Sequence, residues 1–293
     1  MSEIPAIPDV LAPHAEFLES VVVPCVSFRW NRGAPDEAPG GSRLYGDPDL
    51  PEGFAWPVDD DGRPLPFALQ VDLDAVARIF PGRVPLPENP GLLQFFTTFV
   101  ADDRVEDWDL GLFKPERGQN RIVVQRDLTG LRRTRGPVVA DYDGMDGTQA
   151  EPLTPEAGTS APDIAELRWP RHQAPRELVS ADRSTRAAYR DWVSELRRSR
   201  YQAGGYAEWL QDVGFADAVT RERGLTNEDL HGGGGKPANP GLVDEIFAAG
   251  DSWRLVFQVD SLIGDDGALY FVAPLDARGT CDLDRIQVVY QCT

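Results

Sequence analysis

Apolar and polar positions alternate in different ways along this chain, with strand patterns near both ends and helical patterns in the middle. Runs rich in β-branched and aromatic residues predict strands. These strands are expected at 21–28, 67–71, 91–100, 121–125, 253–260, 268–272 and 285–291. The pattern lacks a regular alternation of strand and helix. It therefore predicts an α+β fold with a mainly antiparallel sheet and peripheral helices.

Three segments have the 3.6-residue periodicity of amphipathic helices. A short helix is expected over 9–20. The clearest helix is expected over 183–198, where the residues at i, i+3, i+4 and i+7 from Tyr189 are all apolar. A third helix is expected to start at Asn239-Pro240, with Leu242, Val243, Ile246 and Phe247 on one face. Pro24 interrupts the first predicted strand and favours an edge or a bulge there.

The same order of elements occurs twice. In each half a glycine turn precedes a strand that ends in Gln-Val-Asp, and a glycine then opens a second apolar strand. The matching segments are 46–51, 67–73 and 91–96 in the first half, and 204–206, 255–261 and 267–272 in the second. We therefore expect two pseudo-repeated halves, 1–135 and 181–293, packed as one unit. Residues 136–180 are rich in Pro, Gly, Thr and acidic residues, and an irregular connection is expected there.

Several ordered blocks carry a family resemblance. Residues 42–57 read Ser-Arg-Leu-Tyr-Gly-Asp-Pro-Asp-Leu-Pro-Glu-Gly-Phe-Ala-Trp-Pro, residues 201–206 read Tyr-Gln-Ala-Gly-Gly-Tyr, and residues 263–267 read Ile-Gly-Asp-Asp-Gly. In this order they resemble the YwqG-like family of bacterial proteins, whose function is unknown. Arg43, Tyr201 and Ile263 stand where the family pattern has Lys, His and Trp. The resemblance implies a shared fold and supplies no reaction.

The chain is strongly acidic. Its 293 residues include 48 acidic and 29 basic side chains, which gives a formal net charge of -19. Such a charge is repelled by phosphate backbones and anionic lipid surfaces, so we expect no nucleic-acid partner and no membrane. A basic protein partner or a cationic small molecule is favoured electrostatically. The alternative is that the charge serves only solubility.

Nothing in the sequence predicts a metal site, a cofactor site or secretion. Cys25, Cys281 and Cys292 form no CxxC motif, and the histidines lack the spacing of a zinc site. The first residues have neither a basic segment nor an apolar one, so no signal peptide is predicted. No apolar run is long enough to cross a membrane. We therefore expect a cytoplasmic protein in a reducing compartment.

The two Gln-Val-Asp strand ends are the first candidates for a site. Alternate residues of a strand share a face, so Gln70 should point with Asp72, and Gln258 with Asp260. These two pairs would face each other if a cleft lay between the halves. The alternative is that each glutamine amide satisfies backbone groups at a break in the sheet.

Other candidates come from the resembling blocks. Arg43, near Trp56, has the chemistry to bind an anion or a peptide carboxylate, or to act as a structural clamp. Tyr201 and Gln202 open the Gly-Gly-Tyr block. Asp265 and Asp266 are the last two candidates, although the Asp-Gly sequence at 266–267 favours a tight turn between strands.

Two functional hypotheses follow from the sequence. The first is a binding protein that takes a basic protein partner, in the manner of an immunity protein that neutralises a toxin. It rests on the charge and on the absence of a catalytic signature. The alternative is an enzyme of unknown reaction that acts on a small molecule or peptide in a cleft between the two halves.

Overall fold

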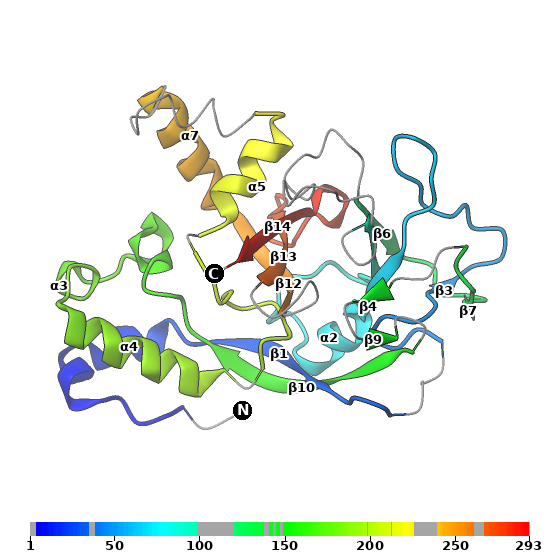
Figure 1. Cartoon of the computed structure of the whole chain (residues 1–293). Coiled ribbons are helices and arrows are strands. Elements are labelled where there is room, and N and C mark those ends of the chain that lie inside the picture. Colours follow the sequence, from blue (N-terminus) through cyan, green and yellow to red (C-terminus); the bar gives the residue numbers. More distant parts are fainter. Residues whose placement is uncertain are drawn as a thin grey trace.

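A ten-stranded antiparallel sheet, curled into a half-barrel, forms the centre of the protein (Figure 1). The computed structural model describes residues 4–34, 39–98, 120–137, 141–142, 145–146, 149–197, 199–211, 213–225, 239–260 and 267–292. The strands of the large sheet lie in the order β14-β13-β12-β11-β1-β10-β2-β4-β5-β6. Together with the helices around it, this sheet confirms the α+β prediction and its antiparallel character.

The strands form one large sheet and two small ribbons. The large sheet contains β1 (Val23–Trp30), β2 (Arg43–Leu44), β4 (Phe67–Asp72), β5 (Leu92–Thr97), β6 (Asn120–Gln125), β10 (Glu151–Ser160), β11 (Gln202–Ala203), β12 (Trp253–Asp260), β13 (Gly267–Pro274) and β14 (Gln287–Cys292). The ribbons pair β3 (Asp49–Leu50) with β7 (Arg132–Arg133), and β8 (Asp141–Tyr142) with β9 (Met145–Asp146).

The helices pack around the sheet (Figure 1), and α2 contributes Leu73 and Val76 to the apolar core inside the half-barrel. They are α1 (Ala15–Ser20), α2 (Leu73–Ile79), α3 (Arg176–Val179), α4 (Arg183–Leu196), α5 (Phe215–Glu222) and α7 (Pro240–Gly250). Short 3₁₀ turns occur at Asp9–His14, Glu166–Arg168, Pro170–His172 and Leu283–Arg285. Among the described residues, no helix is long and apolar enough to cross a membrane.

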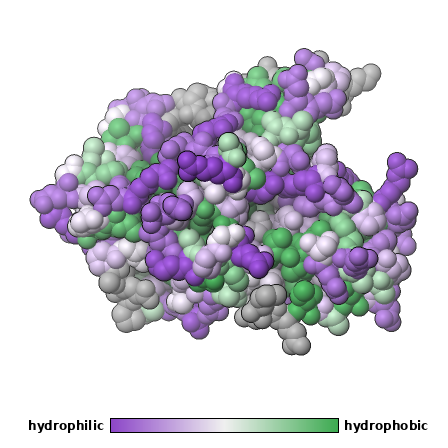
Figure 2. All heavy atoms as spheres, turned by 180° about the vertical axis from the view of Figure 1, so that it is seen from behind, coloured by the Kyte–Doolittle hydropathy of each residue, from purple (hydrophilic) through white to green (hydrophobic). Residues whose placement is uncertain are grey.

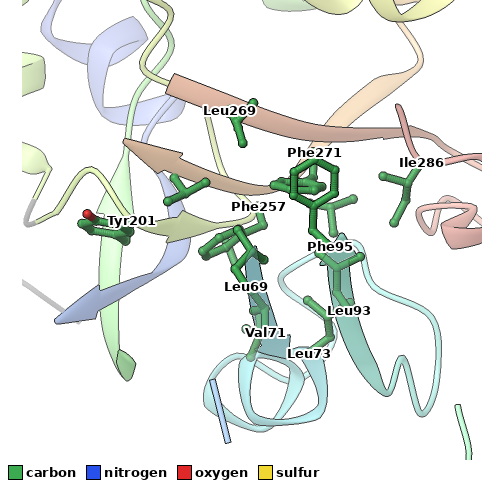
Figure 3. Close-up of a cluster of buried hydrophobic side chains, with 14 of the residues drawn as sticks. Leu69, Val71, Leu73, Leu93, Phe95, Tyr201, Phe257, Leu269, Phe271 and Ile286 are labelled. Atoms are coloured by element: carbon green, nitrogen blue, oxygen red, sulfur yellow. The ribbon is translucent and has the colours of Figure 1, made fainter. Parts of the chain in front are cut away.

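The concave side of the half-barrel holds the largest apolar core (Figure 3). Phe95 of β5 packs edge-on against Phe271 of β13, with ring centroids 5.1 Å apart. These two strands are far apart in the strand order, so their contact requires the sheet to curl. An ion pair of 2.8 Å between Arg126 and Asp284 bridges the segments next to the two edge strands, β6 and β14.

The two outer groups of strands have parallel features. The short strand β2 pairs with β4, and the short strand β11 pairs with β12. Both β4 and β12 contain a register shift, at which Ala68 and Val256 accept hydrogen bonds from the amides of Tyr45 and Gly204. That the two halves are repeats of one unit stays a prediction.

The segment expected to be irregular contains a central strand. β10 runs from Glu151 to Ser160 and pairs with β1 along eight residues of each strand. The sequence does not predict this strand because it contains Pro152 and Pro155. Proline donates no hydrogen bond to a neighbouring strand and is therefore unusual in a central strand. The strand next to it, β1, is central rather than at an edge. Pro24 is tolerated there because β11 pairs only with Val26 and Ser27.

Candidate functional site

Gln70 and Arg43, two of the predicted site residues, belong to a buried polar network on β4 and β2. Arg43 forms an ion pair of 2.8 Å with Asp49. The Gln70 amide donates to Asp49 Oδ2 and to the Gly41 carbonyl, both at 2.7 Å, and its oxygen accepts from the Asp49 amide at 3.1 Å. Burial lowers the pKa of Arg43, while the charge of Asp49 opposes that shift. This network holds the 41–49 segment against the sheet.

Gln258 and Gln202 hold a second segment in the same manner. The oxygen of Gln258 accepts from the amide of Glu208 at 2.9 Å, and its NH₂ group donates to the carbonyl of Arg200 at 3.2 Å. Gln202 pairs with Gln258 across the two strands and donates to the carbonyls of Gly204 and Tyr206 at 2.8 and 2.9 Å. These bonds fix the course of residues 204–208.

The other predicted candidates take part in local contacts. Asp72 caps α2 by accepting from the amide of Ala75 at 2.8 Å, and burial raises its pKa. Asp260 pairs with Arg200 at 2.6 Å. The indole of Trp56 donates a hydrogen bond to the Leu65 carbonyl at 2.9 Å. The ring of Tyr201 lies 5.8 Å from that of Trp30, measured between the centroids. Asp265 and Asp266 lie outside the described residues.

The structure brings these candidates together in two separate groups. Arg43, Gln70 and Asp72 lie on or beside β4, while Gln202, Gln258 and Asp260 lie on β11 and β12. Arg43 lies on β2 and Gln202 on β11, so two strands, β10 and β1, separate the groups in the sheet. Leu69, Val71, Phe257 and Val259 face the concave core, so the two glutamines face away from it. The two Gln-Val-Asp ends therefore do not face each other.

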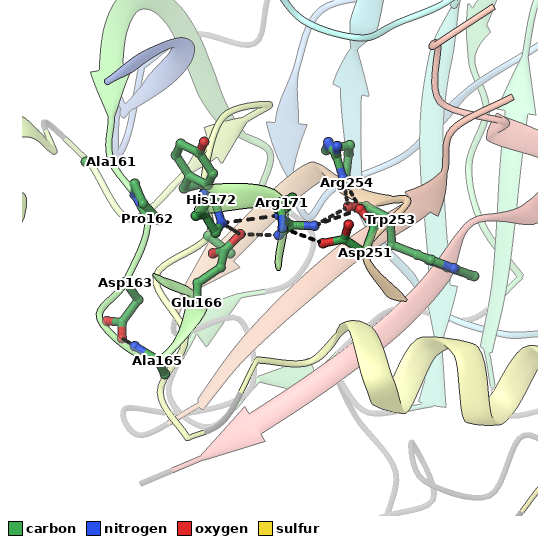
Figure 4. Close-up of polar contacts among 12 residues, drawn as sticks. Ala161, Pro162, Asp163, Ala165, Glu166, Arg171, His172, Asp251, Trp253 and Arg254 are labelled. Carbon is green, nitrogen blue, oxygen red and sulfur yellow. Dashed lines mark hydrogen bonds and ion pairs between the residues drawn. The ribbon is translucent and has the colours of Figure 1, made fainter. Parts of the chain in front are cut away.

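A buried charged cluster that the sequence did not predict lies around Glu166 (Figure 4). The Glu166 carboxylate is ion-paired with Arg171, accepts from the Trp209 indole at 3.2 Å, and lies 3.7 Å from Nε2 of His172. Burial alone would raise the pKa of Glu166, but His172 and the charge of Arg171 outweigh it, so that pKa is lowered. Glu166 therefore stays ionised as a buried anchor for Arg171.

Arg171 connects this cluster to the base of α7. Its Nη1 donates to the carbonyls of Asp251 and Trp253, each at 3.2 Å, and Figure 4 shows it between Glu166 and these two residues. Its guanidinium also lies over the ring of Phe215, 4.7 Å from the centroid. The end of α7 and the start of β12 are thus tied to α5 through one arginine.

Helix α7 presents an aromatic ring to solvent. Phe247 is 49% exposed, while Ile246 beside it is buried. The ring packs on Trp169, with centroids 5.4 Å apart. The helical periodicity predicts Phe247 on one face with Leu242, Val243 and Ile246, and of these four only Ile246 is buried.

The exposed side of α7 is acidic. Asp244 and Glu245 are both exposed, and the helix contains no basic residue. Asp244 lies three residues before Phe247, so the two share one side of the helix. Glu245 lies 3.9 Å from Arg223, a pair that water screens because both side chains are exposed. We call Asp244, Glu245 and Phe247 the α7 surface.

The α7 surface lies on a lobe that stands out from the rest of the protein. Helices α5 and α7 project from the body of the molecule (Figure 1). Figure 2 shows apolar and polar atoms side by side on this lobe at the upper right. A partner could therefore reach α7 without contacting the large sheet.

The sequence offered few signals for these features. Glu166, Arg171 and His172 fall in the segment expected to be irregular, and Glu166 looks like any other of the many acidic residues. A proline-punctuated Trp169-Pro170-Arg171-His172 run was the one local sign of an ordered turn. Within the described ranges, no group of three or more His, Cys, Asp or Glu residues is placed to hold a metal ion.

The architecture is that of an α+β protein built on a curved antiparallel sheet, and its polar candidates chiefly hold the fold together. The chain belongs to the DUF1963 family, a domain of unknown function, whose profile matches residues 42–292. The matched region includes Gln70, Gln258, the Glu166 cluster and the α7 surface. No curated protein matches the chain.

Proposed function

We propose that this protein is a binding protein and that its partner is a basic protein that docks on the α7 surface. The observation that carries the proposal is the exposed Phe247 ring on a helix that bears two exposed carboxylates and no cation. Aromatic side chains on a firm support are the usual anchors of protein interfaces. Asp244 and Glu245 beside the ring would select a cationic surface around an apolar contact.

The support beneath the ring favours binding without rearrangement. Trp169 holds one side of Phe247, and Arg171 ties the end of α7 to Glu166. A preorganised anchor loses little conformational entropy on association. The net charge of -19 would add long-range attraction for a basic partner and raise the association rate at low salt.

The proposal also covers the kind of partner and the cellular compartment. An immunity-like protein that neutralises a basic toxin would need such a surface, and the YwqG-like resemblance of the ordered blocks is compatible with that role. Three free cysteines suit a reducing, cytoplasmic setting. The enzyme alternative has less support because the two predicted polar groups are separated by strands β10 and β1 and are engaged with backbone groups.

Affinity capture from the native host tests the proposal. The wild type is compared with the triple variant Asp244→Asn, Glu245→Gln, Phe247→Ala. The matched control is Glu16→Gln, Glu19→Gln, Val10→Ala, which removes two exposed acids and an apolar side chain that is 47% exposed elsewhere. We expect a basic protein on the wild type and on the control that is absent from the α7 variant. The captured basic protein should elute from the wild type when the salt concentration reaches about 0.5 M.

Equal capture by all three proteins would overturn the α7 surface as the docking site. A captured partner of acidic or neutral charge would overturn the electrostatic part. Circular dichroism and the melting temperature of each variant establish that the comparison is made between folded proteins.

A further inference from the structure

A cavity of about 410 Å³ lies between α4 and the segment 208–210, away from the α7 surface. Its apolar lining comes from Ile164, Val193, Trp209 and Leu210, and its charged lining from Asp163, Arg190, Asp191, Arg197 and Glu208. The volume falls in the range of pockets that hold small molecules, and the mixture of apolar walls with a few charged groups is typical of them. We call it the α4 cavity.

Arg197, at the end of α4, is the most buried charge of the cavity. Its side chain is only 8% exposed. Nη2 donates to the Ala207 carbonyl at 2.9 Å, and Nη1 lies 3.7 Å from the Glu208 carboxylate, which is beyond hydrogen-bond range. Nε has no hydrogen-bond partner among the described residues. Nε is enclosed by the protein, so a ligand carboxylate would contact the guanidinium at Nη1, where Glu208 lies too far away to accept a hydrogen bond.

The acidic side chains of the cavity favour a ligand that also has a positively charged group. Asp163, Asp191 and Glu208 outnumber Arg190 and Arg197 in the lining. A simple anion would meet net repulsion, whereas a molecule with both a carboxylate and an ammonium group would match both signs. The apolar part of the lining then suits an apolar side chain on the same molecule.

The walls of the cavity are held in place by internal hydrogen bonds. Tyr189 donates to the Pro162 carbonyl at 2.7 Å, which fixes the turn before Asp163. On the opposite wall, Gln258 accepts from the amide of Glu208, and Gln291 accepts from the amide of Leu210 at 3.0 Å. The cavity is therefore built before any ligand arrives.

We propose that the α4 cavity binds a zwitterionic amino acid or dipeptide with an apolar side chain. Its carboxylate is held by Arg197 and its ammonium group by Asp163 and Glu208. Trp209 and Val193 contact the side chain. This inference goes beyond the binding of a protein partner, because it concerns a different surface and a different class of ligand.

Isothermal titration calorimetry of the full chain with L-leucine, L-phenylalanine and L-leucyl-L-leucine tests the proposal. We expect at least one of the three to bind. L-leucinamide, which lacks the carboxylate, and 4-methylpentanoate, which lacks the ammonium group, are each expected to bind at least about tenfold more weakly than L-leucine. A stronger response to the dipeptide than to the free amino acids would identify a peptide end as the natural ligand.

Variants at exposed positions test where the ligand binds, because they leave the buried groups unchanged. Ser194 lines the cavity and is exposed, so Ser194→Trp should fill its mouth and abolish binding. Glu195→Trp, on the neighbouring exposed position, and Phe247→Ala should bind like the wild type. The proposal is overturned if none of the three probes binds, or if Ser194→Trp binds as well as Glu195→Trp does. Retained binding by Phe247→Ala separates this result from the fate of the α7 proposal.

Discussion

The indole of Trp169 supports the exposed ring of Phe247, with centroids 5.4 Å apart and planes inclined by 42°. Trp169 is itself buried and belongs to the turn that carries Arg171. The exposed ring therefore rests on a fixed structure rather than on a loose surface side chain. The orientation of the α7 surface depends on this contact.

Gly250 of α7 lies so close to Trp169 that a single methyl group should disturb the support. A Cβ at position 250 would lie 2.6 Å from the indole. Gly250→Ala should lower the free energy of unfolding by about 1–3 kcal/mol through overpacking, although alanine is the better helix former. Gly241→Ala in the same helix is the control, since its nearest neighbour would lie at 3.5 Å. Urea unfolding in which both variants behave alike would contradict the packing.

Glu166 should make the stability of the protein depend on pH in the acid range. Because its pKa is lowered on folding, its contribution is fully present above the pKa of an unfolded glutamate, about 4.3. That contribution is lost as the pH falls through the lower folded pKa. Glu166→Gln should therefore be less stable at pH 7 and lose less stability between neutral and acid pH.

At neutral pH, the stability that Glu166→Gln loses follows from the loss of a buried ion-pair partner. Removing Glu166 leaves Arg171, which is mostly buried, without its carboxylate, at a cost of about 3 kcal/mol or more. The exposed Glu177→Gln serves as the control. Denaturant unfolding of the three proteins from pH 7 downward measures both effects. Parallel pH profiles for the wild type and Glu166→Gln would refute the assignment.

The two glutamine networks should be separable by local measurements. Gln258→Leu removes the acceptor of the Glu208 amide, and Gln70→Leu removes that of the Asp49 amide. Each change should cost about 1–3 kcal/mol because a buried donor is left unpaired. Hydrogen exchange should accelerate at Glu208 only in the first variant and at Asp49 only in the second. Acceleration of both amides in either variant would mean that the networks are coupled.

The cysteines should differ sharply in reactivity. Burial raises the pKa of Cys25 to about 11 and that of Cys281 to about 12, so both thiols stay protonated and covered at pH 8. Cys292 is only partly buried. Titration with a disulfide reagent should give one reactive thiol in the native protein and three after denaturation. Rapid modification of a Cys292→Ser variant would contradict this order.

The sequence was sufficient for the strands whose apolar pattern is local. β4, β5, β12 and β13 were predicted because their runs of β-branched and aromatic residues need no knowledge of their neighbours. β10 was missed because Pro152 and Pro155 resemble loop residues, and only the long pairing with β1 makes them part of a strand. A pairing between segments more than a hundred residues apart leaves no local pattern.

The candidate sites were harder to predict for the same reason. Gln70 and Gln258 were recognised as unusual polar residues in apolar strands, yet their partners, Asp49 and Glu208, lie on segments brought in by the fold. The exposure of Phe247 depends on how little of α7 is covered by α5 and Trp169. The helical periodicity predicts only that this ring shares a face of the helix with Ile246.

Docking of a basic partner on the α7 surface is tested most directly by the affinity of a captured partner for Phe247→Ala. Isothermal titration calorimetry would compare the wild type, Phe247→Ala and Val10→Ala at low salt. We predict at least a tenfold loss of affinity, about 1.4 kcal/mol, for Phe247→Ala and none for Val10→Ala. Unchanged affinity for Phe247→Ala would contradict the α7 surface as the site at which this protein binds its partner.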